Sequence, residues 1–111
     1  MNLADLRVVT WNCAGALRNK WHALEQFDAD LLVIQECEDP AQAKDARYLD
    51  WAGDYLWEGD TKNKGIGVFA RKGVRLEREP VDVKELKFFL PCRINGDWPL
   101  LATWTAAADS G

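Results

Sequence analysis

The spacing of hydrophobic residues changes from one segment of this chain to the next, and each spacing predicts a different secondary-structure element. Residues 6–12 (LRVVTWN) are rich in β-branched and aromatic side chains, which predicts a first strand. Leu17, Trp21 and Leu24 then fall at i, i+4 and i+7, the spacing of one helical stripe. Residues 31–35 (LLVIQ) form an unbroken apolar run, which is typical of a strand buried on both faces.

A strand, a helix and a second strand in this order predict a βαβ unit. The crossover makes the two strands parallel, so both end at the same edge of the sheet. Asn12 ends the first strand and Glu36 follows the second. Because ligands bind at this edge in open α/β sheets, Asn12 and Glu36 are the first candidate site residues.

The remaining chain predicts several shorter elements. They are a helix at 40–47 that starts at Pro40, a strand at 55–57, a polar exposed loop at 59–65, and strands at 66–71, 74–78, 88–94 and 100–105. We expect 66–71 and 74–78 to pair as a hairpin. Asn95-Gly96 predicts a hairpin between the last two strands, because type I′ turns need positive φ at both central residues. Residues 106–111 have no period and are expected to form a frayed tail.

The predicted helices are too few to cover both faces of the predicted sheet. These patterns indicate an α/β fold with a mixed sheet of about six strands and helices on one face. If the other face buried roughly 1,000 Å² per subunit, the interface would be of the obligate class, and about 25 kcal/mol of apolar transfer would depend on it. We therefore expect a homodimer or a complementing second half-domain. Shorter strands with long covering loops are the alternative.

Length and charge narrow the functional classes. The chain has 111 residues, which allows one domain at most. Its formal charge of −4 disfavours nucleic acid as a partner, although a local basic patch remains an alternative. The cations between 71 and 78 lie among Glu77 and Glu79, which is typical of a solvated face.

The number and spacing of the cysteines help to predict the cellular compartment of the protein. Cys13, Cys37 and Cys92 are odd in number and form no CxxC pair, and no apolar segment opens the chain. These features favour a reduced, cytoplasmic protein. No apolar run approaches the roughly 20 residues of a membrane span, so no membrane partner is expected.

Four segments carry a resemblance to a known family. Residues 8–12 (VVTWN) and 33–36 (VIQE) resemble the first strands of the endonuclease/exonuclease/phosphatase superfamily, in particular its deoxyribonuclease and apurinic-endonuclease group. Residues 64–71 (KGIGVFAR) and 100–105 (LLATWT) are similar to later strands of its first half. The resemblance implies that 1–111 is a single truncated domain, half of a four-layer α/β sandwich whose C-terminal half is absent. It also implies that Asn12 and Glu36 bind Mg²⁺ beside the scissile phosphate.

The chain departs from that family in the residues that complete the site. The family's Gly-Asp-x-Asn and Ser-Asp-His segments do not occur, and the one histidine, His22, is expected to be structural or exposed. The resemblance therefore implies a truncated Mg²⁺-dependent phosphoester hydrolase that is inactive alone, which leaves its status as an enzyme open. The alternatives are a non-catalytic assembly module that self-associates through its exposed sheet face, and a fragment of a longer enzyme.

The candidate site residues also have simpler interpretations. One carboxylate and one amide give weak Mg²⁺ affinity unless Glu38 or Asp39 contributes a second carboxylate. Asn12 could instead cap the following turn, and Glu36 could pair with Arg18 or Lys20. Cys13 and Cys37 are expected to be buried inert thiols, and the six tryptophans are expected to pack rather than stack bases.

Overall fold

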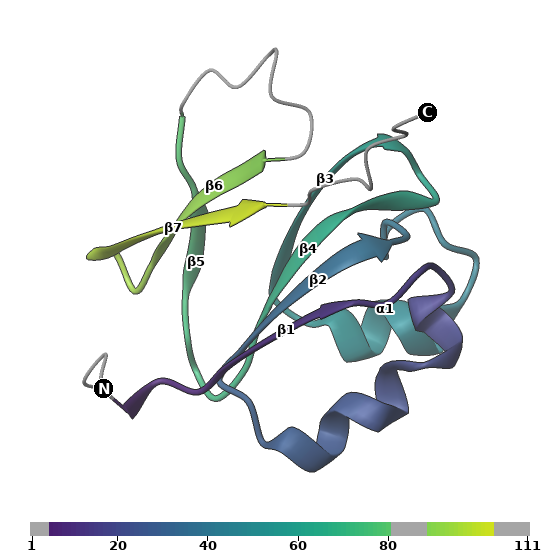
Figure 1. The fold of residues 1–111 in the computed structure, drawn as a ribbon, viewed down its shortest axis with the longest axis horizontal. Coiled ribbons are helices and arrows are strands. Elements are labelled where there is room, and N and C mark those ends of the chain that lie inside the picture. Colours follow the sequence, from purple (N-terminus) through teal and green to yellow (C-terminus); the bar gives the residue numbers. More distant parts are fainter. Residues whose placement is uncertain (1–4, 81–88, 104–111) are drawn as a thin grey trace, which may run out of the picture.

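The fold has mixed α/β content and consists mainly of strands (Figure 1). A computed structural model describes residues 5–80 and 89–103. The elements are β1 (Val8–Asn12), η2 (Leu17–Asn19), η3 (Trp21–Phe27), β2 (Leu31–Cys37), α1 (Ala46–Ala52), β3 (Tyr55–Thr61), β4 (Lys64–Ala70), β5 (Leu76–Arg78), β6 (Phe89–Ile94) and β7 (Trp98–Thr103). Trp104, Thr105 and the predicted tail lie outside the described residues.

A four-stranded sheet in the order β1-β2-β4-β3 forms the centre of the molecule. β1 and β2 are parallel, with Asn12 opposite Gln35, so the predicted parallel pairing of the two strands is confirmed. β4 runs antiparallel to both of its neighbours, β2 and β3. The sheet is therefore mixed, and the ends of β1 and β2 meet at one edge, as expected.

The crossover consists of two short 3₁₀ helices, η2 and η3, where the sequence predicted one helical stripe. Leu17 and Leu24 are buried, and Trp21 packs against the same core, so the predicted apolar face is confirmed. The chain bends between the two helices at Lys20, which has φ −121° and ψ −13° and lies outside helical geometry. This bend divides the predicted helix.

The second helix begins later than predicted. α1 starts after Asp45, whose Oδ1 accepts hydrogen bonds from the backbone nitrogens of Arg47 at 3.0 Å and Tyr48 at 3.3 Å. An Asp in this position satisfies amide groups that a helix leaves unpaired at its first turn. The prediction that the helix would occupy 40–47 is therefore wrong, because the side-chain cap at Asp45 determines the start.

The expected exposed loop at 59–65 is almost entirely strand. β3 and β4 continue to Thr61 and Lys64, which are opposite each other, so a tight turn at Lys62 and Asn63 connects the strands. Gly59 and Gly65 allow this close approach: a Cβ built on either would collide with the Trp57 ring and with backbone. The glycines that suggested a loop permit close packing here.

β5, β6 and β7 form a separate sheet in the order β5-β6-β7. The Asn95-Gly96 hairpin is confirmed, with φ values of 54° and 78°. The hairpin predicted between 66–71 and 74–78 is wrong: β4 is already paired on both edges, and β5 pairs with β6. Lys72 and Gly73, both with positive φ, lead the chain from one sheet to the other.

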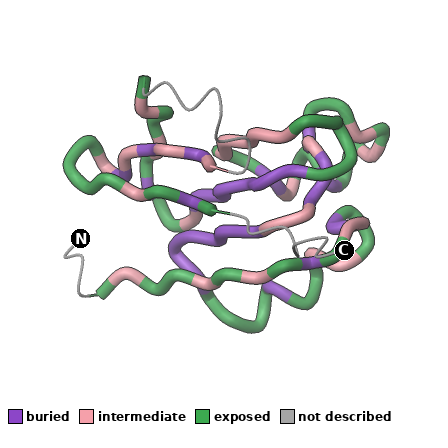
Figure 2. The backbone as a smooth tube through the Cα atoms, turned by 45° about the horizontal axis from the view of Figure 1, so that its top comes forward, coloured by how far each residue is buried: buried purple, intermediate pink, exposed green. Residues whose placement is uncertain are grey.

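The three-stranded sheet covers the face of the four-stranded sheet that was expected to lack cover. Leu32 and Ile34 face the helices, whereas Leu31 and Val33 belong to a second core, with side chains from β6 and β7. Figure 1 shows the helices on one side of β2 and β4 and the second sheet on the other, and Figure 2 shows buried residues concentrated in the middle of the molecule. A single sheet of about six strands was thus the wrong arrangement, because the last three strands form their own layer.

The helices of the described segments are all short. Among residues 5–80 and 89–103, no helix has the length and apolar character needed to cross a membrane.

Candidate functional site

The structure brings Asn12 and Glu36 together at the common end of β1 and β2. Nδ2 of Asn12 donates a hydrogen bond to Oε2 of Glu36 over 2.7 Å, across 24 positions of sequence. Asn12 is the last residue of β1, and Glu36 lies at a register shift between Gln35 and Cys37 in β2. The predicted proximity of the two side chains is confirmed.

The register shift determines the direction of the Glu36 side chain. Glu36 has φ 59°, a region that residues other than glycine rarely adopt. Its carbonyl oxygen accepts from the Cys13 thiol at 3.3 Å, and the backbone nitrogen of Cys13 donates to the Gln35 carbonyl at 3.0 Å. A bulge of this kind redirects a side chain out of the strand's alternation, and here it directs the carboxylate toward the neighbouring strand end.

The amide oxygen of Asn12 is used by the turn that follows β1. Oδ1 accepts from the backbone nitrogen of Ala14 at 3.0 Å, and Ala14, Gly15 and Ala16 all have positive φ. The turn-capping interpretation of Asn12 is therefore confirmed alongside its proximity to Glu36. In this arrangement Asn12 fixes the turn with its oxygen and orients the Glu36 carboxylate with its nitrogen.

Among the described residues, Lys64 forms an ion pair with Glu36. Its Nζ is 3.7 Å from Glu36 Oε1, because β4 lies beside β2 and starts at this edge. Arg18 and Lys20, the partners weighed from sequence, bind elsewhere: Arg18 pairs with Glu38 at 2.7 Å, and Lys20 donates to the Cys13 carbonyl at 2.7 Å. Sequence reasoning missed Lys64 because nothing local showed that β4 inserts next to β2.

Glu38 is a structural anchor. Glu38 is 4% exposed, and its carboxylate accepts hydrogen bonds from the Leu17 backbone nitrogen at 2.8 Å and from the Arg18 guanidinium at 2.7 Å. The Tyr48 hydroxyl donates to the Glu38 carbonyl at 2.7 Å. Glu38 thereby ties the segment after β2 to η2 and α1.

Asp39 is also engaged locally. Its two carboxylate oxygens accept from the Ala41 backbone nitrogen at 3.0 Å and from the Gln42 amide at 2.7 Å. Within the described ranges, no group of three or more His, Cys, Asp or Glu side chains is placed to hold a metal ion. The Glu36 carboxylate offers hard oxygen donors that suit a Mg²⁺ ion retaining most of its waters, whereas the Asn12 oxygen already accepts from the Ala14 backbone. The pair therefore fits such an ion only loosely.

All three cysteines are buried free thiols, which confirms the expected burial of Cys13 and Cys37. Burial raises the pKa of Cys13 and, more strongly, of Cys37, and the proximity of the two sulfurs raises the pKa of Cys37 further. Both act as thiol donors, Cys13 to the Glu36 carbonyl and Cys37 to the Ile34 carbonyl. Protonated thiols of this kind support the strand ends and are poor nucleophiles.

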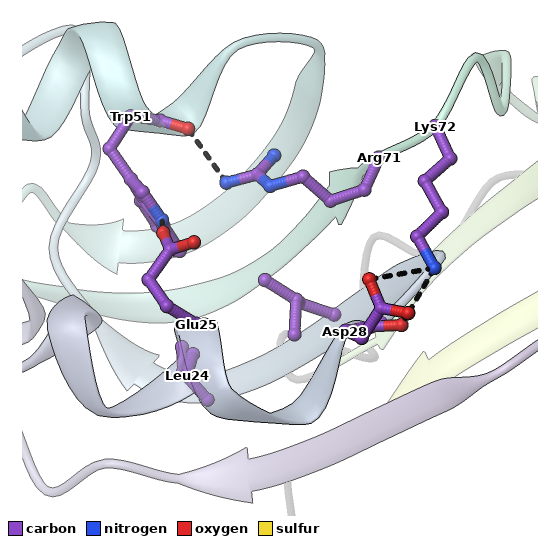
Figure 3. Close-up of a pocket in the computed structure, with 8 residues that line it drawn as sticks. Leu24, Glu25, Asp28, Trp51, Arg71 and Lys72 are labelled. Atoms are coloured by element: carbon purple, nitrogen blue, oxygen red, sulfur yellow. Dashed lines mark hydrogen bonds and ion pairs between the residues drawn. The ribbon is translucent and has the colours of Figure 1, made fainter.

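A hollow lies on the helical side of the sheet, with a cavity volume of about 190 Å³ (Figure 3). Arg71 donates to the Trp51 carbonyl at 2.7 Å, and its guanidinium lies 4.7 Å from the centroid of the Trp51 ring. Lys72 pairs with Asp28 at 3.0 Å. Because its charged groups bind one another and the backbone, this hollow joins the helices to the sheet and carries no candidate chemistry.

Aromatic residues form part of the same packing. Trp51 lies 5.8 Å from Trp21 and 5.0 Å from Phe69 between ring centroids. His22 is exposed and stacks on Trp21 at 3.6 Å, in agreement with its expected structural or surface position. These tryptophans are placed for packing.

Comparison of the chain with protein-family models, curated proteins and solved structures found no match in any of the three.

Proposed function

We propose that this chain forms the metal-binding side of a Mg²⁺-dependent phosphoester hydrolase site of the endonuclease/exonuclease/phosphatase type. The observation that carries the proposal is the 2.7 Å hydrogen bond between Asn12 and Glu36 at the shared end of two parallel strands. This edge is the usual ligand position in an α/β sheet. The sequence motifs around both residues support the same assignment.

Each residue has a distinct part in this proposal. The Glu36 carboxylate is the ligand for the ion, and Asn12 holds that carboxylate in place through its amide nitrogen. Lys64, at 3.7 Å from Glu36, adds a positive charge on the side where an anionic substrate would approach. When bound, the ion would polarise a phosphoryl oxygen of the substrate.

Hydrolysis needs further groups. Among the described residues, His22 stacks on Trp21 and the Glu38 carboxylate is bound to the Leu17 backbone, and no three His, Cys, Asp or Glu side chains form a metal-binding group. We therefore assign none of these residues to the activation of a water molecule. We propose that these groups come from a complementing half-domain. The described part of the chain is expected to bind metal and substrate without turnover of its own.

The decisive experiment is a metal titration with a readout other than activity. Mn²⁺, which accepts the same oxygen ligands as Mg²⁺, should broaden NMR signals around Glu36, and excess Mg²⁺ should restore them. Glu36→Gln should abolish the effect, whereas Glu77→Gln, on the exposed surface of β5, should preserve it. Equal broadening in all three proteins would overturn the metal assignment.

Self-association is the second candidate. The structure buries the sheet face first considered for this role, but edge strand β7 exposes 43% of Trp98 and 54% of Leu101. Edge strands with exposed apolar side chains favour pairing with another chain. Sedimentation should then show a dimer that Leu101→Lys converts to monomer, and a monomeric wild type would eliminate this candidate.

A further inference from the structure

A cavity of about 320 Å³ lies close to the Asn12–Glu36 pair and has no part in the function proposed so far. Arg18, Lys44, Lys62 and Asn63 line it, together with Glu38. Two connections place it near the pair: Glu38 follows Glu36 by two residues, and Lys62 precedes Lys64, which lies 3.7 Å from Glu36. Since two residues of extended chain span at most about 7 Å, the backbone of Glu38 lies within about that distance of Glu36, and that of Lys62 within about that distance of Lys64.

The charge of this cavity is opposite to that of the chain. The chain carries a formal charge of −4, yet three cationic side chains line the cavity with one carboxylate, that of Glu38. Glu38 is already bound to Arg18 and to the backbone of η2. Lys44 and Lys62 form no ion pair with any residue in the described ranges, so their charges face the cavity without a counterion from this part of the protein.

Suitable hydrogen-bond donors accompany these charges. The Arg18 side chain is 46% exposed and uses one nitrogen on Glu38, which leaves further N–H groups of its guanidinium for a ligand. Asn63 adds a side-chain amide at the hairpin turn. Guanidinium, ammonium and amide donors are the groups that bind phosphate oxygens in proteins.

The cavity is held in shape by the backbone. Lys62 and Asn63 form the tight turn between β3 and β4, and the Lys62 carbonyl accepts from the backbone nitrogen of Asp39 at 2.8 Å. This bond fastens the turn to the segment that supplies Lys44. The cationic groups therefore converge from three elements whose backbones are fixed relative to one another.

We propose that this cavity binds a phosphate group, namely a second phosphate of a substrate whose scissile phosphate lies at Glu36. The inference deepens the proposed hydrolase function and depends on it only for the position of the scissile phosphate. Anion binding in the cavity requires neither metal nor turnover. The substrate class is accordingly a molecule with at least two phosphate groups, either a nucleic-acid strand or a small polyphosphorylated compound.

The test is a binding titration of the full chain in EDTA, with inorganic tripolyphosphate and a single-stranded oligothymidylate as separate probes. Saturable binding of either probe is expected, and the tighter probe identifies the source of the phosphate. Lys44→Gln and Lys62→Gln together should weaken binding about tenfold and reduce its salt dependence. Lys72→Gln makes the same charge change as Lys62→Gln alone, beyond the other end of β4, and should leave the affinity within about twofold.

Two results would overturn the proposal: no saturable binding of either probe, or an equal loss of affinity in Lys72→Gln and Lys62→Gln, which would indicate a diffuse charge effect. Circular dichroism of each variant verifies its fold. Glu36→Gln should retain probe binding in EDTA. If it does while the Mn²⁺ experiment fails, the cavity is a phosphate site and the hydrolase proposal alone is wrong.

Discussion

The side chains of Asn12 and Glu36 are joined by a 2.7 Å hydrogen bond in which a neutral amide orients a carboxylate. The bond links the end of one parallel strand to a bulge at the end of the next, and the amide oxygen is simultaneously used by the Ala14 backbone. Asn12 therefore fixes Glu36 without cancelling its charge. Among the described residues, Lys64 balances part of that charge, with its Nζ 3.7 Å from Glu36 Oε1.

Replacing Asn12 by Asp should make stability depend on Mg²⁺. Two carboxylates would then meet where an amide and a carboxylate now bond, and their repulsion should cost about 1 kcal/mol or more in EDTA. A bound cation would relieve it, so Mg²⁺ should raise the melting temperature of Asn12→Asp more than that of the wild type. Asn12→Ala, which lacks the added charge, is the matched control. An equal Mg²⁺ response in all three proteins would contradict a cation site here.

Glu38 should be more important for stability than for function. Glu38→Ala removes the partner of the half-exposed Arg18 side chain and the acceptor of the Leu17 backbone nitrogen, which leaves that buried donor unpaired. We expect a loss of about 2–4 kcal/mol, measured by urea unfolding. Glu38→Gln should cost less, because it retains an acceptor. A loss below that of the exposed variant Glu77→Ala would show that Glu38 is not an anchor.

The sequence predicted the elements whose signals are local. The β-branched run at β1 and the apolar run at β2 specify two strands, and the crossover rule places Asn12 beside Glu36. Asn95-Gly96 likewise specifies its own hairpin through backbone conformation. These features depend on neighbouring residues or on the general rule that a crossover connects parallel strands, so one sequence is sufficient.

The arrangement of sheets depends on long-range pairing, and there the sequence was insufficient. β4 could pair with β5 by proximity in the chain, but it inserts between β2 and β3, which leaves β5 to pair with β6. Lys64 reaches Glu36 only as a result of that insertion. The same insertion creates the turn at Lys62 and therefore the cationic cavity that Lys62 lines. The acidic overall charge of the chain gave no indication of this cavity.

Gly65 should be intolerant of any side chain. A Cβ there would collide with the Glu58 carbonyl and the Trp57 ring, in a strand that is closely paired on both edges. Overpacking of this kind costs about 1–3 kcal/mol, so Gly65→Ala should lower the midpoint of urea unfolding clearly. Gly73 has open space around its Cβ position but a φ of +80°. Gly73→Asn, which tolerates that φ, should cost about 1 kcal/mol or less; a larger loss there than at Gly65 would contradict the close approach.

The stability of the fold should decrease in alkaline solution because of its buried thiols. Burial raises the pKa of Cys92 from 9.0 to about 11, so between these values the folded protein retains a proton that the unfolded chain releases. The native state then binds more protons, and the free energy of unfolding falls as pH rises through that window and levels off above it. Two pKa units correspond to about 2–3 kcal/mol, to which Cys13 and Cys37 add in the same direction.

Cys92→Ala isolates this contribution of the thiol. Its cavity cost is independent of pH, so urea unfolding in reductant at about pH 8 and about pH 11 should show a smaller decrease in the variant than in the wild type. Cys92 lies in the core between the two sheets, where it is fully buried. An identical pH slope in both proteins would mean that water reaches this sulfur, and that the three-stranded sheet does not seal the second core.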